Sequence, residues 1–131
     1  MGIELTSGVH ATLLEEAARA HPFECCGLLL GQGVRIERAV PAANVHPDPA
    51  RHFEIDPAAL ITAHKAERSG GAQLLGYYHS HPNGRADPSP SDRAQAAGDG
   101  RLWAIVANEA VLVWRDTAAG FQALPLRLVE G

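Results

Sequence analysis

Three parts of the chain carry the pattern of a helix. In the first part, Val9, Leu13 and Ala17 recur at helical intervals with charged residues between them, as in an amphipathic helix. The other two parts begin with an aspartate or a serine that is directly followed by proline, at Asp56 and Ser89. That order suits a helix N-cap and the first helical position. We therefore expect helices over residues 7–20, 57–68 and 90–97.

Shorter apolar or alternating runs, bounded by glycine, proline or asparagine, predict strands between these helices. Gln32-Gly33 and Asn108-Glu109 separate two pairs of such runs and indicate hairpins. The segment 41–52 is rich in proline and predicts an irregular loop. The expected strands cover residues 26–31, 34–39, 53–55, 73–81, 102–107, 110–114 and 121–129. Helices and strands alternate in this pattern, which predicts a mixed α/β or α+β domain.

Composition and charge favour a single globular domain and disfavour a nucleic-acid-binding or membrane protein. A chain of 131 residues fits one domain over residues 1–131, and 46% hydrophobic residues suffice for a core without disulfides. The net charge of −4 disfavours general binding to nucleic acid. No apolar run is long enough to span a membrane, and the N-terminus lacks the pattern of a signal peptide. Cys25 and Cys26 are adjacent, so we expect buried apolar side chains in a cytoplasmic protein.

The residues with the clearest chemistry are two histidines near the end of a predicted strand. His79 and His81 are separated by one residue, so both side chains lie on the same face of the strand. Asp92 follows in the first turn of the predicted third helix and offers a carboxylate as third ligand. Two histidines and one carboxylate are typical of a catalytic zinc site, which keeps one position open for water. The alternative for the histidines is a pair of solvent-facing strand residues.

A hydrolytic site also needs a proton acceptor and a donor for the developing oxyanion. Glu24 stands beside a core strand between apolar neighbours and is a candidate general base. An ordinary exposed loop carboxylate is an equally good interpretation of Glu24 from its position alone. The Ser89 hydroxyl is a candidate oxyanion donor, although a helix cap alone also explains it. His46 and His52, in the predicted long loop, are further candidates to border the site.

Taken together, these residues resemble the motif of the JAMM (MPN+) zinc metalloproteases. The motif consists of a glutamate, then His-x-His-Pro, then Ser-x-x-Asp, which matches Glu24, residues 79–82 and residues 89–92. The segment 22–31, Asn44, and Phe53 with Asp56 also resemble the family. The resemblance implies that His79, His81 and Asp92 bind one Zn²⁺, that Glu24 is the acid/base, and that Ser89 steadies the tetrahedral intermediate. It also implies a curved mixed β-sheet flanked by helices, the cytidine-deaminase-like JAMM/MPN architecture.

The resemblance implies an enzyme that hydrolyses a peptide or isopeptide bond. The chain is similar to the compact stand-alone prokaryotic members, some of which trim ubiquitin-like sulfur carriers to expose a Gly-Gly tail. We therefore expect a ubiquitin-like or sulfur-carrier substrate, and neither nucleic acid nor membrane as a partner. Three alternatives are weaker. A non-catalytic MPN interaction module has no chemical need for the five motif residues. A Cys-His protease leaves the spacing of the motif unexplained. The family's DNA-repair-associated branch fits an acidic chain poorly.

Overall fold

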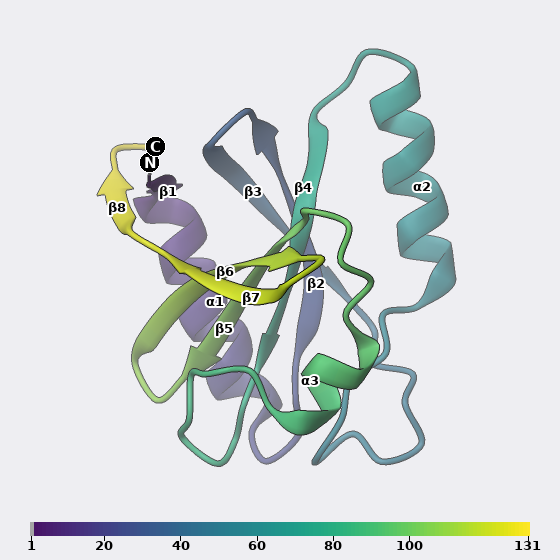
Figure 1. Ribbon diagram of the computed structural model, residues 1–131, viewed down its shortest axis with the longest axis vertical. Coiled ribbons are helices and arrows are strands. Elements are labelled where there is room, and N and C mark those ends of the chain that lie inside the picture. The colour runs from purple at the N-terminus through teal and green to yellow at the C-terminus, as the bar shows by residue number, and fades with distance from the viewer. Residues whose placement is uncertain (1) are drawn as a thin grey trace.

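A computed structural model describes residues 2–131 of the protein (Figure 1). These residues form three helices and eight strands. The helices are α1 (Ser7–Ala20), α2 (Pro57–Arg68) and α3 (Pro90–Gln95). The strands are β1 (Ile3–Thr6), β2 (Cys26–Gln32), β3 (Arg35–Ala42), β4 (Gln73–Ser80), β5 (Leu102–Ala107), β6 (Ala110–Thr117), β7 (Gly120–Leu124) and β8 (Leu126–Val129). None of these described helices is long and apolar enough to cross a membrane.

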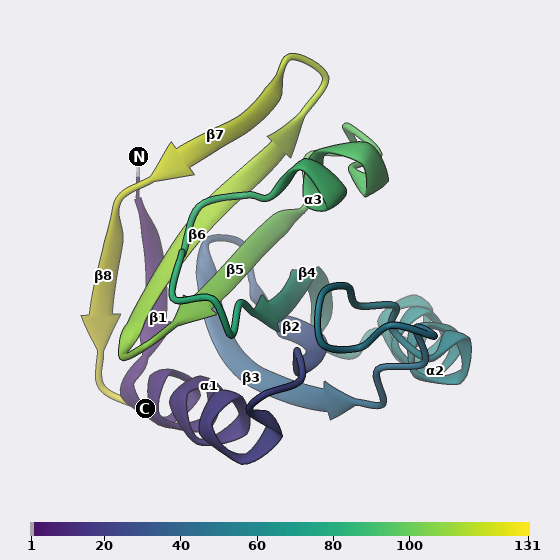
Figure 2. The same ribbon diagram turned by 90° about the horizontal axis from the view of Figure 1, so that it is seen from below.

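All eight strands belong to one mixed sheet in the order β7-β6-β5-β4-β2-β3-β1-β8. The β4–β5, β1–β3 and β1–β8 pairs are parallel and the other pairs are antiparallel. The sheet is strongly curved, and β7 and β8 follow one another along one side although they occupy its two ends (Figure 2). The expected α+β class with a curved sheet is confirmed. The strand order places β4, which contains His79 and ends next to His81, near the middle of the sheet.

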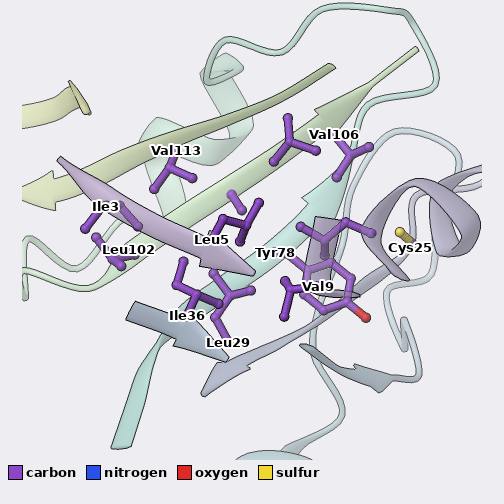
Figure 3. Close-up of a cluster of buried hydrophobic side chains, with 13 residues drawn as sticks. Ile3, Leu5, Val9, Cys25, Leu29, Ile36, Tyr78, Leu102, Val106 and Val113 are labelled. Atoms are coloured by element: carbon purple, nitrogen blue, oxygen red, sulfur yellow. The ribbon is translucent and has the colours of Figure 1, made fainter. Parts of the chain in front are cut away.

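The two faces of the sheet bury separate apolar clusters because successive side chains of a strand point to opposite faces. On one face, Val9 and Leu13 of α1 pack over Leu29 and Tyr78 (Figure 3). On the other face, Ala63 of α2 belongs to the second cluster, which also includes Leu28, Phe53 and Trp103. Tyr78 therefore faces α1, and His79, the next residue, stacks on Phe53 on the face of α2.

The chain between β4 and β5 carries α3 and is tied to β6 at two points. The Trp114 indole N–H donates to the Ala86 carbonyl at 3.2 Å, before the helix begins. After the helix, the Asp116 carboxylate accepts hydrogen bonds from the backbone N–H groups of Ala97 and Gly98 at 3.0–3.1 Å. Asp116 is only 1% exposed. These contacts fix α3 above the sheet, next to the end of β4 (Figure 1).

Several boundaries differ from the prediction. The third helix ends at Gln95 instead of Ala97, and Pro125 divides the expected last strand into β7 and β8, since proline cannot donate a ladder hydrogen bond. The expected strand 53–55 is wrong, because only Ile55 forms an isolated bridge, to Asn44. The pattern also missed β1, whose four residues run directly into α1 with Thr6 as its N-cap.

Candidate active site

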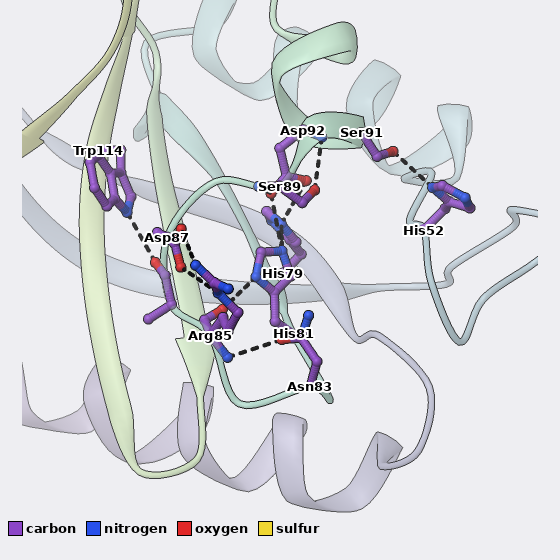
Figure 4. Close-up of polar contacts among 11 residues, drawn as sticks. His52, His79, His81, Asn83, Arg85, Asp87, Ser89, Ser91, Asp92 and Trp114 are labelled. Carbon is purple, nitrogen blue, oxygen red and sulfur yellow. Dashed lines mark hydrogen bonds and ion pairs between the residues drawn. The ribbon is translucent and has the colours of Figure 1, made fainter.

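The two histidines lie at the end of β4 and are almost completely buried. The exposed fractions are 0% for His79 and 6% for His81. Their Nε2 atoms face each other at 3.0 Å. The His81 Nδ1 atom lies 2.6 Å from the Arg85 carbonyl oxygen, so Nδ1–H donates to it (Figure 4). That hydrogen bond leaves the Nε2 lone pair of His81 free for a cation.

Asp92 joins the histidines from the first turn of α3. One carboxylate oxygen, Oδ1, lies 3.0 Å from His79 Nε2, and the other, Oδ2, lies 3.0 Å from His81 Nε2. The aspartate is oriented by a reciprocal capping box with Ser89. The Asp92 N–H donates to Ser89 Oγ at 3.0 Å, and the Ser89 N–H donates to Asp92 Oδ2 at 2.9 Å. The sequence Ser-Pro-x-Asp thus starts the helix and also aims its carboxylate at the histidines.

These three side chains fit a small divalent cation. Ligands of tetrahedral zinc at about 2.0–2.1 Å from the metal lie roughly 3.3 Å from one another. The 3.0 Å separations among the two Nε2 atoms and the Asp92 oxygens are close to that value. Two nitrogens and a carboxylate are also the donor types that zinc prefers. The donor set and its spacing therefore fit zinc, with His79, His81 and Asp92 as the residues that would hold it.

A fourth buried side chain, Glu24, completes the cluster from the segment that leads into β2. Glu24 is 6% exposed, and its ligand atom lies within 4.8 Å of those of His79 and His81. Its Oε1 atom has no hydrogen-bond partner among the described residues. The interpretation of Glu24 as an ordinary exposed carboxylate is therefore wrong. Burying a carboxylate oxygen without a hydrogen-bond partner costs free energy. This cost indicates that Glu24 interacts with a molecule that binds beside it.

Burial sets the electrostatics of the cluster. Loss of solvent raises the pKa of Glu24 from its ordinary value of 4.5 to about 7, with His81 lowering it and Asp92 raising it further. Burial lowers the pKa of His79, against the hydrogen bond to Asp92. Burial alone would raise the pKa of the Asp92 carboxyl, but its close contacts with the His79 and His81 rings outweigh burial and hold that pKa well below the usual range. The cluster thus contains one firmly ionised carboxylate, Asp92, and one that exchanges protons near neutral pH, Glu24.

The loop 43–56 covers one side of the cluster. The Pro49 carbonyl accepts a hydrogen bond from the Glu24 N–H at 2.8 Å. His52 Nδ1 lies 2.8 Å from Ser91 Oγ in the first turn of α3 (Figure 4), and the rings of His46 and His52 lie 4.8 Å apart. His52 therefore borders the site, as its place in the long loop suggested. His46 and His52 do not belong to the group of potential metal ligands found among residues 2–131.

Residue pattern alone predicted neither of two groups that shape this site. The Arg85 carbonyl oxygen has no side-chain signal, because a backbone acceptor is specified only by the turn that presents it. Asn44 was noticed only through the family resemblance, yet its side chain makes four hydrogen bonds to backbone groups of the loop and of Glu24. An asparagine among prolines in a long loop is the available signal, since its amide can satisfy several backbone groups at once.

The fold and the cluster define a class: an α+β domain with a His-x-His strand, an aspartate at a helix start, and a buried glutamate beside them. The chain belongs to the family described as prokaryotic homologs of the JAB domain, which matches residues 6–119. A structure of AF2198, a JAB1/MPN domain protein from Archaeoglobus fulgidus, has the same fold, with a TM-score of 0.67 and 21% identity over 98% of each chain. The resemblance to the JAMM/MPN+ family and its architecture is therefore confirmed.

Two curated relatives are similar over most of the chain. A probable TtuB-protein conjugate cleaving protease from Thermus thermophilus is 47% identical over 89 residues, 64% of this chain and 59% of the relative. A desampylase from Haloferax volcanii is 36% identical over 93 residues, 70% of this chain and 67% of the relative. The chain thus spans between half and about two thirds of the length of these relatives.

Proposed function

We propose that the protein is a zinc-dependent peptidase or isopeptidase that cuts an amide bond at the C-terminus of a ubiquitin-like protein. The observation that carries this proposal is the meeting of three potential zinc ligands with a glutamate whose pKa is about 7. A general base works best when its pKa lies near the working pH. The two relatives, one named for cleaving protein conjugates and one named a desampylase, support the same activity.

Each of these side chains has a separate role in the proposed hydrolysis. His79, His81 and Asp92 would hold the zinc, which would supply Lewis acidity toward the carbonyl and the attacking water. Glu24 would take a proton from the attacking water and return it to the leaving amine, because it is buried beside the histidines with a carboxylate oxygen that has no hydrogen-bond partner among the described residues. The Ser89 oxygen accepts from the Asp92 N–H, so its own proton is free to donate to the developing oxyanion.

The proposed substrate is a small ubiquitin-like or sulfur-carrier protein that ends in Gly-Gly, followed by a residue, a short tail or a conjugated lysine. A flexible Gly-Gly tail lacks side chains, so it can reach buried groups such as His79 and Glu24 through a narrow approach. A cytoplasmic location and a single domain over residues 1–131 stay predictions, supported by the two unpaired cysteines and by the one continuous sheet.

The direct test is to incubate the protein with a ubiquitin-fold sulfur carrier that bears one residue after Gly-Gly, and to read the mass of the carrier. We expect loss of that residue with zinc and no loss after treatment with a chelator. Glu24→Gln should keep zinc but reduce cleavage to a small residual rate. Stoichiometric zinc binding without cleavage of any carrier fusion or conjugate would contradict the proposal and favour a non-catalytic interaction module.

A further inference from the structure

Asn44 is half-buried at the start of the loop 43–56, where its side chain makes four hydrogen bonds. Its Nδ2 group donates to the carbonyl oxygens of Glu24 and His52, both at 3.0 Å. Its Oδ1 atom accepts from the backbone N–H groups of His46 at 3.1 Å and Glu54 at 3.0 Å. One amide therefore connects both ends of the loop to the residue proposed as general base.

The backbone of Glu24 depends on this loop because Glu24 precedes β2 and has no place in the sheet ladder. Its N–H donates to Pro49 and its carbonyl accepts from Asn44, so the loop holds both backbone groups of the residue. The following residue, Cys25, is instead fixed to β4 by two hydrogen bonds with Ser80. The side chain of Glu24 makes no compensating contact through Oε1. The orientation of the Glu24 side chain therefore depends on the hydrogen bonds that hold the backbone of Glu24 and Cys25.

We propose that Asn44 is a positioning residue, which holds the backbone of Glu24 so that its carboxylate faces the histidine cluster. This inference rests on the proposed function, because it assigns Asn44 to the proton-transferring group of that reaction. An asparagine side chain is suited to the task, since it offers two N–H donors and an oxygen with two lone pairs on one rigid plane. Misplacement of a reacting group by about 1 Å costs on the order of 100-fold in rate.

The test uses Asn44→Ala and Asn44→Asp, because the aspartate keeps acceptor oxygens for the loop while it loses the two donors and places a negative charge against the carbonyl oxygens of Glu24 and His52. With the carrier fusion as substrate, we expect kcat to fall about 10- to 100-fold, as for other residues that orient a site, while KM and zinc content stay within about twofold. Gln73→Ala is the matched control. It removes another amide, which accepts from the Gly33 N–H at 2.8 Å in the β2–β3 turn, and should leave kcat unchanged.

Two further measurements separate positioning from a general structural role. In a Glu24→Gln background, Asn44→Ala should lower the residual rate by no more than about twofold, since its effect passes through Glu24. In the metal-free protein, the Glu24 amide should exchange with deuterium faster in both Asn44 variants, while amides of β5 keep their protection. The exchange experiment needs no catalysis, so it tests the hold of Asn44 on Glu24 even if the wild type cleaves no carrier.

Several results would overturn the proposal. Three results would each show that Asn44 does not act through Glu24. One is a double variant in which the two losses in rate multiply, and another is loss of zinc by Asn44→Asp. The third is an unchanged deuterium exchange rate at the Glu24 amide. If Asn44→Ala does not fold, Asn44→Asp is read alone. Failure of both variants to fold would make Asn44 a general folding residue and would equally overturn its assignment as a positioning residue.

Discussion

Replacement of Glu24 by glutamine should stabilise the metal-free protein, and the gain should depend on pH. The glutamate is 6% exposed, and burial raises its pKa from 4.5 to about 7. A carboxyl whose pKa is raised on folding contributes its full stability below the unfolded pKa of 4.5. That stability is lost as the pH rises from 4.5 to about 7, because the unfolded chain ionises over this range while the buried carboxyl of the folded protein keeps its proton. Glutamine has a similar shape and never ionises.

The size of the effect follows from the two pKa values. Each pKa unit is worth about 1.4 kcal/mol, so the difference between 4.5 and about 7 corresponds to about 3 kcal/mol at pH 8–9. In a domain of 131 residues, this is roughly a 10 °C rise in Tm. Wild type and Glu24→Gln should therefore unfold at nearly equal temperatures at pH 4.5, diverge as the pH rises to about 7, and keep a constant difference above it.

The assay is thermal unfolding of both proteins in the presence of a chelator, at pH values from 4.5 to 9. Glu109→Gln serves as the matched control, since Glu109 is an exposed carboxylate in the β5–β6 turn and its replacement changes the net charge equally. Parallel curves for wild type and Glu24→Gln would refute the conclusion that Glu24 is buried without compensation. A gain of the same size in Glu109→Gln would assign the effect to net charge instead of to the site.

Three other predictions follow from the structure. His79→Ala should lose stoichiometric zinc binding in a metal titration, whereas His64→Ala, a histidine on α2, should retain it. Asp116→Ala should leave the two N–H groups after α3 without their acceptor, at a cost of about 3 kcal/mol measured by denaturant unfolding. Gly27→Ala should cost about 1–3 kcal/mol in the same assay, because a Cβ atom there would lie 2.4 Å from both the Tyr78 ring and the Val40 carbonyl oxygen.

Each of these predictions has a contrary result. Zinc binding by His79→Ala at the wild-type affinity would remove β4 from the metal site. Unchanged unfolding of Asp116→Ala would show that the hydrogen bonds of its carboxylate do not secure α3. Wild-type stability of Gly27→Ala would mean that the Tyr78 ring moves aside at no cost.

The parts of the site set by local rules could be predicted from the sequence. His79 and His81 share a face because the side-chain period of a strand is two. Ser89 and Asp92 face each other because a serine N-cap and an acidic third residue form a capping box. The helix ranges were predictable for the same reason, since caps and prolines act within one turn. The short strand β1 was not, because its partners β3 and β8 are distant in sequence.

The environment of Glu24 could not be predicted in this way. Its backbone is held by Asn44 and Pro49, in a loop whose proline-rich sequence specifies irregularity and no particular path. The same loop made Phe53-Glu54-Ile55 resemble a strand, although Phe53 instead stacks on His79 with ring centroids 4.1 Å apart. Contacts between segments distant in sequence thus decide the chemistry of the glutamate, while local pattern alone fixes the histidine pair.

The most direct test of the central claim is to locate the metal and its third ligand. Both Asp92 and Glu24 bring a carboxylate close to the histidines, and the account assigns the cation to Asp92 and leaves Glu24 free to move protons. Anomalous X-ray diffraction from zinc-loaded crystals, at the zinc absorption edge, distinguishes the two carboxylates. We predict a single peak within coordination distance of His79, His81 and Asp92, with both Glu24 oxygens outside it. A peak coordinated by Glu24 instead of Asp92, or no peak at the histidines, would contradict the account.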